Sequence, residues 1–300
     1  MKRCHNNWYN HFITKSLKQA IFLIRKDDEL FPTLLRETSS CPKSLFCRGV
    51  LPDKNEICIA VVGTRKATRD GLITAKTISY DLAEAGACVI SGLALGIDGA
   101  AHEGALAAGG KTYAVLANGL DSIYPRQHEN LGEKIIESGG GLISEYPEGT
   151  PSLPHQFLER NRIVSGMSIA TVVIEAPERS GSLATARLAL EEGRDVFVVP
   201  GPTSNRNYRG SHFLIREGAR LVTSASDILG DLGFEIKRKE PELTDIQTLV
   251  MNALKDHTAF SVDKISEFTK LEARIVSSAL TFLTLEGLVE EKNGEFKLKE

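Results

Sequence analysis

SGLALGIDGAAH, at residues 91–102, is the stretch of sequence that decides the fold. An apolar run ends at Ser91, Gly92 and Gly96 let the chain turn, and an alanine-rich helical pattern follows. A strand that turns through glycine into a helix leaves backbone N–H groups free at the positive end of the helix dipole, where phosphate binds. The stretch therefore predicts a phosphate-binding turn in an α/β protein. An ordinary tight turn with Asp98 as the helix cap is an alternative that these residues leave open.

The segment VVGTR, at residues 61–65, repeats the order of apolar strand and small-residue turn. Gly63 frees the chain to turn, Thr64 offers a hydroxyl, and the guanidinium of Arg65 is a forked donor that suits phosphate oxygens. A surface arginine that pairs with a nearby carboxylate would give the same pattern. Arg65 is therefore a candidate ligand, with a plain surface role as its alternative.

A third turn lies within APERSGSLATA, at residues 176–186. Ser180, Gly181 and Ser182 precede a helical pattern, so hydroxyls and free amides meet at another helix start. A serine that only caps its own helix is an equal alternative. Because ligands of open α/β sheets bind outside the carboxyl ends of the strands, the three turns are predicted to form one site.

The most polar cluster of the chain is HQFLERNRIVSG, at residues 155–166. Arg160 and Arg162 are two positions apart, so on a helix they point to different faces, whereas in an extended segment they share one. One is expected to bind ligand while the other binds the protein. Arginines that only hold Glu145 or Glu175 in place are the alternative.

Two other residues of this cluster suit a nucleic-acid strand. Asn161 supplies an amide, and the ring of Phe157 offers a surface on which a base can stack. Stacking of this kind tolerates any sequence because every base has a π face. The cluster therefore predicts contacts to a single strand.

Between residues 51 and 236 the chain alternates apolar runs with helical patterns. The runs are rich in Val and Ile, apolar on both faces and bounded by glycine, as buried parallel strands are. This alternation predicts an α/β fold with an extended Rossmann-like, mostly parallel, doubly wound sheet. The predicted strands lie at 59–63, 88–92, 112–117, 141–145, 169–176, 196–201 and 219–222, and the helices between them include 71–85, 97–108, 127–138, 183–192 and 212–217.

The two ends of the chain differ from this core. Residues 1–50 are predicted to form a short leader with one amphipathic helix at 16–25, and the charged stretch KRKEPE at 237–242 is a predicted linker. Residues 243–300 carry three helical patterns and then a hairpin, which is the order of a winged-helix module. The helices are expected at 243–255, 262–268 and 271–286, with the hairpin turn at Asn293 and Gly294.

Composition excludes several classes of protein. A net charge of −3 provides no general basic surface for a polyanion, so phosphate binding must be local. The five cysteines lack paired metal spacing and fit a reducing, cytoplasmic compartment, and the seven histidines are dispersed. No P-loop, targeting segment or membrane span is present. We expect no metal, no cofactor and no membrane contact.

Eight blocks, taken together and in order, make this chain similar to the DprA/Smf family of DNA-processing proteins over residues 30–230. The resemblance implies a Rossmann-like core that dimerises, binds single-stranded DNA without strong sequence preference, and loads RecA onto it during natural transformation. It implies no catalysis. The blocks are VVGTR, SGLALGIDGAAH, GLDSIYP at 119–125, GLISEYP, ERNRIVSG, SGSLATA, GRDVFVVPG and a later GA.

The same resemblance implies which residues form the DNA pocket. Relatives often have Phe-Pro before the RNR block, whereas this chain has Phe157 and Leu158, so the stacking ring is kept. Many relatives also carry a helical domain ahead of the core, for which about 30 residues leave too little room. The implied pocket residues are Gly63, Thr64, Arg65, Ser91, Gly92, Gly96, Phe157, Arg160, Asn161, Arg162, Ser180, Gly181 and Ser182.

The carboxyl-terminal module also resembles a domain that some members carry. Its candidate recognition helix, at 271–286, holds only Arg274 against Glu272 and Glu286. Readers of duplex DNA need cations for the phosphates, so protein contact or self-association is favoured over DNA binding for this module.

The sequence thus predicts a cytoplasmic, dimeric, non-catalytic protein that binds single-stranded DNA and delivers it to RecA recombinase. Two other functions stay open. One is a nucleotide-binding enzyme of a related Rossmann fold, such as a phosphoribohydrolase, although PERSGSLATA lacks the PGG start of its glycine-rich turn. The other is a nucleotide-sensing regulator whose winged helix binds duplex DNA.

Overall fold

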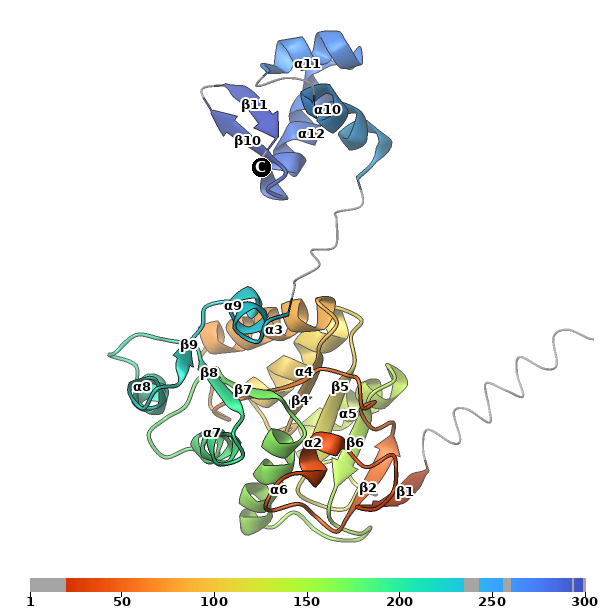
Figure 1. The fold of residues 1–300 in the computed structure, drawn as a ribbon, viewed down its shortest axis with the longest axis vertical. Helices are drawn as coiled ribbons and strands as arrows, with labels where there is room; N and C mark the ends of the chain where they lie inside the picture. The colour runs from red at the N-terminus through yellow and green to blue at the C-terminus, as the bar shows by residue number, and fades with distance from the viewer. Residues whose placement is uncertain (1–19, 235–242, 256–259, 293, 299–300) are drawn as a thin grey trace, which may run out of the picture. The chain divides into compact units, whose positions relative to one another are not determined.

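A computed structural model describes residues 20–234, 243–255, 260–292 and 294–298 of the chain. The chain divides into two compact units, Met1–Ile236 and Lys237–Glu300 (Figure 1). The predicted linker at 237–242 and residues 16–19 of the predicted amino-terminal helix lie outside the described residues.

The described part of the first unit is built on one nine-stranded sheet, in the order β1-β2-β6-β5-β4-β3-β7-β8-β9. The strands from β6 to β9 in this order run parallel, and every position of β3 and β5 is buried. All seven predicted strands are confirmed, as is the mostly parallel, doubly wound sheet. These strands are β3 (Cys58–Val62), β4 (Cys88–Ser91), β5 (Thr112–Leu116), β6 (Gly141–Ser144), β7 (Ala170–Val173), β8 (Asp195–Val198) and β9 (Arg220–Leu221).

Helices cover both faces of this sheet. Neighbouring residues of one strand pack into different cores, as when Val89 joins one cluster and Ile90 the other, because successive side chains of a strand point to opposite faces. One face carries α3 (Arg69–Glu84), α4 (Ile97–Ala107), α5 (Glu129–Glu137) and α9 (Ala225–Asp231). The other carries α2 (Thr33–Arg36), α6 (Pro154–Gly166), α7 (Gly181–Glu191) and α8 (Arg209–Arg216), and the short helices η1 (Arg126–His128) and η2 (Arg206–Tyr208) lie in connecting loops.

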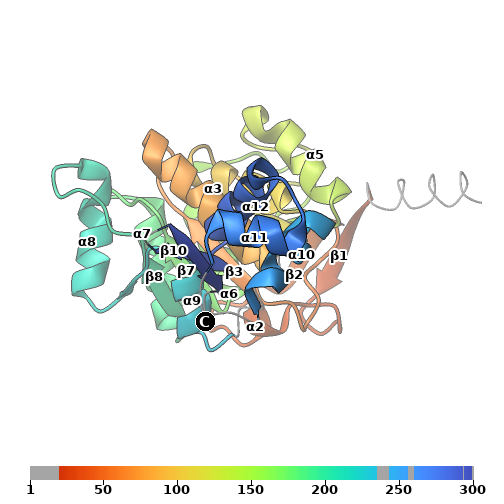
Figure 2. The same ribbon diagram turned by 90° about the horizontal axis from the view of Figure 1, so that it is seen from above.

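The predicted amino-terminal helix is wrong for Ile21–Arg25, which form the edge strand β1. β1 pairs antiparallel with β2 (Ser44–Gly49), and β2 pairs antiparallel with β6. Figure 2 shows β1 and β2 at one end of the sheet and β8 with α8 at the other. Only Ile24 of β1 is buried, so its apolar run lacks the strict alternation that distinguishes a strand from an amphipathic helix. Residues 20–50 therefore extend the sheet instead of preceding it as a leader.

The order of the strands reverses at β3. The chain moves from β3 through β4, β5 and β6 in one direction, and then returns to place β7, β8 and β9 on the other side. Ligands of open α/β sheets bind outside the carboxyl ends of the strands at such a reversal. The three glycine-containing turns follow β3, β4 and β7, which are neighbours in the sheet, so the prediction that they share one edge is confirmed.

The second unit confirms the predicted three helices and hairpin. Its elements are α10 (Asp245–Lys255), α11 (Val262–Thr269), α12 (Ala273–Leu285), β10 (Val289–Lys292) and β11 (Glu295–Leu298). Ile265, Val276 and Leu280 are buried together in a small core of its own. Gly294 adopts a φ of +79° at the hairpin turn, a backbone conformation that glycine adopts without strain, while Asn293 lies outside the described residues.

Candidate functional site

A cavity of about 620 Å³ lies outside the carboxyl ends of β3, β4 and β7. It is lined by residues of all three turns and of α6. Ser91, Gly96 and Arg162 do not line it, although the sequence predicts them in the site. The predicted residues that the structure does bring together are Gly63, Thr64, Arg65, Gly92, Phe157, Arg160, Asn161, Ser180, Gly181 and Ser182.

The exposed wall of the cavity is cationic. Arg65, Lys66 and Arg179 line it and are solvent-exposed. Among the described residues that line the cavity, Asp98 alone carries a carboxylate. A local excess of positive charge therefore exists here in a protein whose net charge is −3, as the sequence predicts.

Arg65 is also stacked on an aromatic ring. Its Cζ atom lies 4.6 Å from the ring centroid of Phe157, and that ring lies 5.7 Å from the ring of Tyr124. Arginine over an aromatic face gains from the negative potential of the ring, and its side chain is held in one orientation. The cavity thus has a planar, charged surface beside two rings, which are the groups that hold unpaired bases and phosphates.

The turn that carries Arg65 is anchored by Glu175, a fully buried carboxylate at the end of β7. The backbone N–H and hydroxyl of Thr68 donate to this carboxylate, and the backbone N–H of Thr64 donates to the Glu175 carbonyl at 2.8 Å. The amide of Asn207 donates both to the Glu175 carboxylate and to the Lys66 carbonyl, at 3.0 and 2.9 Å. The turn is therefore fixed at both ends before any ligand arrives.

Arg160 lies beneath the turn that follows β4. It is 5 % exposed, its Nη1 donates to the Val115 carbonyl, and a methyl group at Gly92 would overlap its guanidinium. Burial lowers the pKa of Arg160 to about 10, and burial raises the pKa of Asp98, which the charge of Arg160 partly offsets. Arg160 thus remains charged at neutral pH and supports the floor of the cavity.

The starts of α4 and α7 differ in what they offer an anion. The N–H of Ile97 donates to the Thr64 carbonyl at 3.3 Å, and the N–H groups of Gly92 and Ala94 donate to Asp98 at 3.2 and 3.4 Å. The neighbouring turn thus uses the N–H of Ile97, and Asp98 uses the N–H groups of Gly92 and Ala94, so these three donors are not open to an anion.

At the start of α7 the donors remain open. Within the described residues, the backbone N–H groups of Gly181 and Ser182 have no hydrogen-bond acceptor. The hydroxyl of Ser180 accepts from the Leu183 N–H at 3.4 Å, so Ser180 is also the helix cap. The predicted serine cap is therefore confirmed, and phosphate binding at these two amides stays a prediction.

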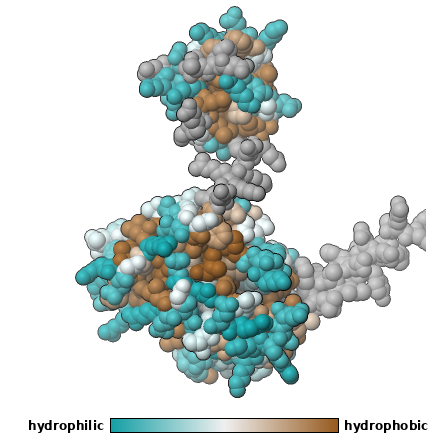
Figure 3. All heavy atoms as spheres, in the orientation of Figure 1, coloured by the Kyte–Doolittle hydropathy of each residue, from teal (hydrophilic) through white to brown (hydrophobic). Residues whose placement is uncertain are grey.

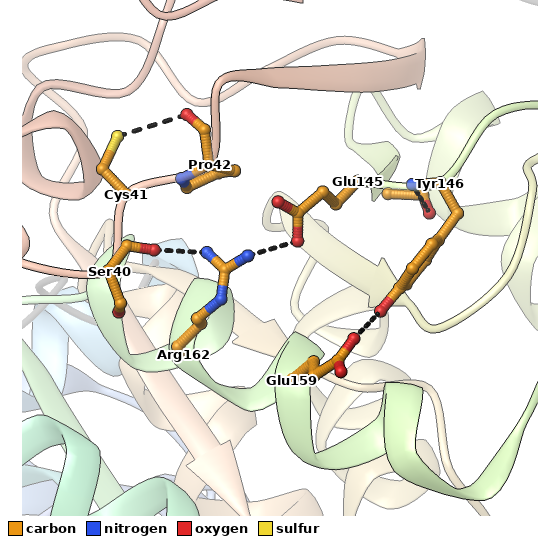
Figure 4. Close-up of polar contacts among 8 residues, drawn as sticks. Ser40, Cys41, Pro42, Glu145, Tyr146, Glu159 and Arg162 are labelled. Atoms are coloured by element: carbon orange, nitrogen blue, oxygen red, sulfur yellow. Dashed lines mark hydrogen bonds and ion pairs between the residues drawn. The ribbon is translucent and has the colours of Figure 1, made fainter.

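Arg162 points away from the cavity. Its guanidinium donates to the Glu145 carboxylate and to the Ser40 carbonyl, as Figure 4 shows. The same figure shows the hydroxyl of Tyr146 donating to Glu159 at 2.7 Å. Because α6 is a helix, the structure separates the two arginines of the RNR block as their spacing predicts for that case, and Arg162 has the role of holding Glu145.

Ser91 and Gly96 serve the walls of the cavity. The hydroxyl of Ser91 donates to the Val61 carbonyl at 2.6 Å, which joins β4 to β3. Gly96 has a φ of +82°, and a side chain there would overlap the Thr64 carbonyl. Both residues therefore allow the first two turns to pack closely, and neither faces the cavity.

Several residues at the site escape sequence reasoning. Lys66 follows Arg65 directly and reads as an ordinary surface lysine, and Arg179 sits in a charged loop. Tyr124 comes from the loop after β5, which no phosphate pattern marks. The GLDSIYP block that resembles the family is the one signal in the sequence that points to this loop.

Two further features bear on chemistry at the site. His102 is fully buried, its Nδ1 lies 2.7 Å from the Thr112 hydroxyl, and burial lowers its pKa to about 3. In the described ranges no group of three or more His, Cys, Asp or Glu side chains is arranged to hold a metal ion.

No described helix combines the length and apolar character needed to cross a membrane.

Comparison with known protein families covers both units. A family profile described as DNA recombination-mediator protein A matches residues 22–233, and a profile described as the DprA winged helix domain matches residues 236–295.

Curated relatives give the same result. Protein Smf of Escherichia coli is 46 % identical over 212 residues, which are 71 % of this chain and 57 % of that protein. The putative DNA processing protein DprA of Mycobacterium tuberculosis is 41 % identical over 298 residues, covering 92 % of this chain and 76 % of the relative. The chain therefore spans just over half of the first of these proteins and three quarters of the second.

Two solved structures share the fold. DNA processing protein A (DprA) from Streptococcus pneumoniae superposes with a TM-score of 0.66 at 37 % identity, over 77 % of this chain and 81 % of that one. DNA processing protein A from Helicobacter pylori, described for its single-stranded DNA binding mode, gives 0.63 at 28 % identity, over 71 % and 96 %.

Proposed function

Because this chain belongs to the DNA recombination-mediator protein A family, we propose that it binds single-stranded DNA and passes it to a recombinase. The strand would occupy the cavity at the carboxyl ends of β3, β4 and β7. The role is one of occupancy and handover during natural transformation, in the cytoplasm and without catalysis.

The observation that carries the proposal is the make-up of this cavity. Arg65, Lys66 and Arg179 supply charge for phosphates, the amides of Gly181 and Ser182 supply donors, and Phe157 supplies a ring. These groups recognise the phosphate backbone of DNA and the faces of its bases. Neither of these two features depends on the nucleotide sequence. The relative from Helicobacter pylori, described for its single-stranded DNA binding mode, supports the same ligand.

The proposal includes two protein partners, a second copy of the chain and RecA. Figure 3 shows apolar side chains gathered on one face of the first unit in the region of α3, from which Leu72, Ile73 and Tyr80 are exposed. Exposed apolar groups of this kind are typical of protein contact surfaces. Two cavities on a dimer would raise the apparent affinity for a long strand, because the second binding event becomes intramolecular.

The second unit has a different proposed role, in protein contact or self-association. The solvent-facing side of α12 carries Ser277, Ser278 and Thr281, with Arg274 as its exposed cation. A helix that enters a major groove needs several cations for phosphates and base edges. Hydroxyl side chains in place of cations favour a protein partner.

A direct titration tests the proposal. A fluorescent oligo-dT is titrated with the purified full chain at two salt concentrations, and unlabelled duplex DNA and AMP compete in separate series. We expect tight, salt-dependent binding that duplex and AMP displace poorly, followed by faster RecA assembly on the bound strand. Absence of oligo-dT binding together with binding or cleavage of AMP would replace this function with that of a nucleotide enzyme. Strong binding to duplex through the second unit would favour the regulator.

A further inference from the structure

The loop between β5 and η1, which carries the sequence GLDSIYP at 119–125, is held rigidly at the rim of the cavity. The amide of Asn118 donates to the carbonyls of Gly119 and Ser122, both at 2.8 Å. The Gly119 N–H donates to the Thr150 carbonyl at 2.9 Å, and the Asp121 carboxylate accepts from the Gly149 N–H at 2.8 Å. The loop is therefore shaped in advance and ties into the segment that precedes α6.

Packing within the protein explains why most residues of the GLDSIYP block are the types they are, but it gives no reason for a tyrosine at position 124. Gly119 has no room for a side chain beside the Pro147 carbonyl, Leu120 is buried, and Ile123 packs against the core under α5. Tyr124 is 46 % exposed and lines the cavity. Within the described part of the chain its hydroxyl has no hydrogen-bond partner. A large ring held in water on a fixed loop has the features of a binding residue.

We propose that Tyr124 is a second base-stacking position, so that the site holds two successive bases of a single strand, one at Phe157 with Arg65 and one at Tyr124. This inference rests on the proposed function and specifies how the strand crosses the cavity. The rings of Tyr124 and Phe157 have centroids 5.7 Å apart and planes inclined at 56°, so they form two separate platforms instead of one stack.

The inclination of the platforms also bears on selectivity. Neighbouring bases in one strand of a duplex lie nearly parallel, about 3.4 Å apart along the axis, whereas bases that lie flat on two rings inclined at 56° are tilted away from each other. A single strand can adopt this arrangement, whereas a duplex would have to lose its pairing and stacking. The arrangement therefore selects single strands through base orientation, in addition to charge.

The charges around Tyr124 fit a strand that passes over it. Arg126 is two residues further on and exposed, and Arg65 contacts the Phe157 ring that neighbours Tyr124. Phosphates that flank a base stacked on Tyr124 would thus have cations nearby. The interaction needs the ring and makes no use of the hydroxyl.

The test compares Tyr124→Ala, Tyr124→Leu and Tyr124→Phe with the unaltered chain in binding to oligo-dT. Phe213→Ala is the matched control, because Phe213 is an aromatic residue of the first unit that is 46 % exposed, like Tyr124, and lies on α8 outside the cavity lining. We expect Tyr124→Ala and Tyr124→Leu to weaken binding about tenfold, with Tyr124→Phe and Phe213→Ala within twofold of the parent. Thermal melts establish that each variant folds.

An oligonucleotide with abasic sites and one with a single 2-aminopurine separate stacking from other effects. The difference between the parent and Tyr124→Leu should vanish on the abasic strand, and quenching of 2-aminopurine should fall in Tyr124→Leu. Tyr124→Leu binding within twofold of the parent, while Arg65→Ala binds weakly, would overturn the second platform and leave the proposed function standing. Failure of the parent itself to bind oligo-dT would overturn the proposed function as well.

Discussion

The guanidinium of Arg65 lies over the ring of Phe157, 4.6 Å from Cζ to the ring centroid, and this contact joins two walls of the cavity. Arg65 belongs to the turn after β3, whereas Phe157 belongs to α6. The pair places a plane and a positive charge at one point. A lysine at position 65 would keep the charge and lose the plane, because an ammonium group is a compact point charge.

Arg65→Ala should weaken binding of oligo-dT by about 1–3 kcal/mol, because it removes a phosphate partner and the cover of the Phe157 ring. The slope of log affinity against log salt should fall by about one, since one fewer counterion is released. Titrations at several salt concentrations measure both effects. Arg187→Ala, at an exposed position of α7 that does not line the cavity, should bind normally. An unchanged affinity in Arg65→Ala would remove this residue from the site.

Gly92→Ala should destabilise the fold by about 2 kcal/mol or more, because the new methyl group would overlap the buried guanidinium of Arg160. Gly230→Ala is the control, as no atom outside its chain neighbours and its own helix backbone lies within 4 Å of the position its methyl group would occupy. Denaturant melts of both variants provide the comparison. Equal stability of the two would mean that Arg160 moves aside readily.

Glu175→Gln should lower stability by about 1–3 kcal/mol, because its new amide group faces the donors of Thr68 and Asn207. Affinity for oligo-dT should fall as well, since the same carboxylate anchors the turn that carries Arg65. Glu178→Gln, an exposed neighbour on the same segment, should change neither quantity. If Glu175→Gln melts lower but binds as tightly as the parent, the anchor is structural only.

Arg162→Ala should cost about 1–2 kcal/mol of stability through loss of the Glu145 ion pair and the Ser40 hydrogen bond. Its affinity for oligo-dT should stay within about twofold, because the side chain does not reach the cavity. The measurement is a melt and a titration on the same preparation. A loss of affinity as large as that of Arg65→Ala would show that Arg162 does contact the strand.

The stability of the first unit should depend on His102 in acid. Burial lowers the pKa of this imidazole to about 3, whereas in the unfolded chain it is about 6.5. The unfolded state therefore binds more protons between these values, so the contribution is complete above pH 6.5 and is lost as the pH falls toward 3. His102→Gln should show a shallower decrease in unfolding free energy from pH 7 to pH 4. Parallel curves for the two proteins would contradict this assignment.

The sequence predicts the sheet well because buried parallel strands are apolar on both faces, as β3 and β5 are at every position. The sequence also predicts that the three turns lie at one edge of the sheet, because each turn follows a parallel strand and the carboxyl ends of parallel strands meet at the same edge. It fails at β1, where only Ile24 is buried and exposed Phe22 and Leu23 hide the period of a strand.

Side-chain roles are harder to predict from the sequence than positions. Spacing shows that Arg160 and Arg162 face different ways if the segment is a helix, but their partners, Val115 and Glu145, come from other strands and loops. The open amides at the start of α7 and the occupied Ile97 amide at the start of α4 look alike in sequence, because the Thr64 carbonyl that accepts from Ile97 reaches it only in the folded chain. Glu175 is missed as an anchor since Thr68 and Asn207 reach it only in the folded chain.

The antiparallel attachment of β2 to β6 has a practical consequence for handling the protein. A fragment cut to begin at residue 51 would retain the cavity, but it would leave one side of β6 with bare peptide N–H and C=O groups. Such an uncovered edge recruits strands from other molecules, and the fragment would tend to precipitate for reasons unrelated to DNA. A soluble minimal version of the cavity therefore has to start ahead of Ile21.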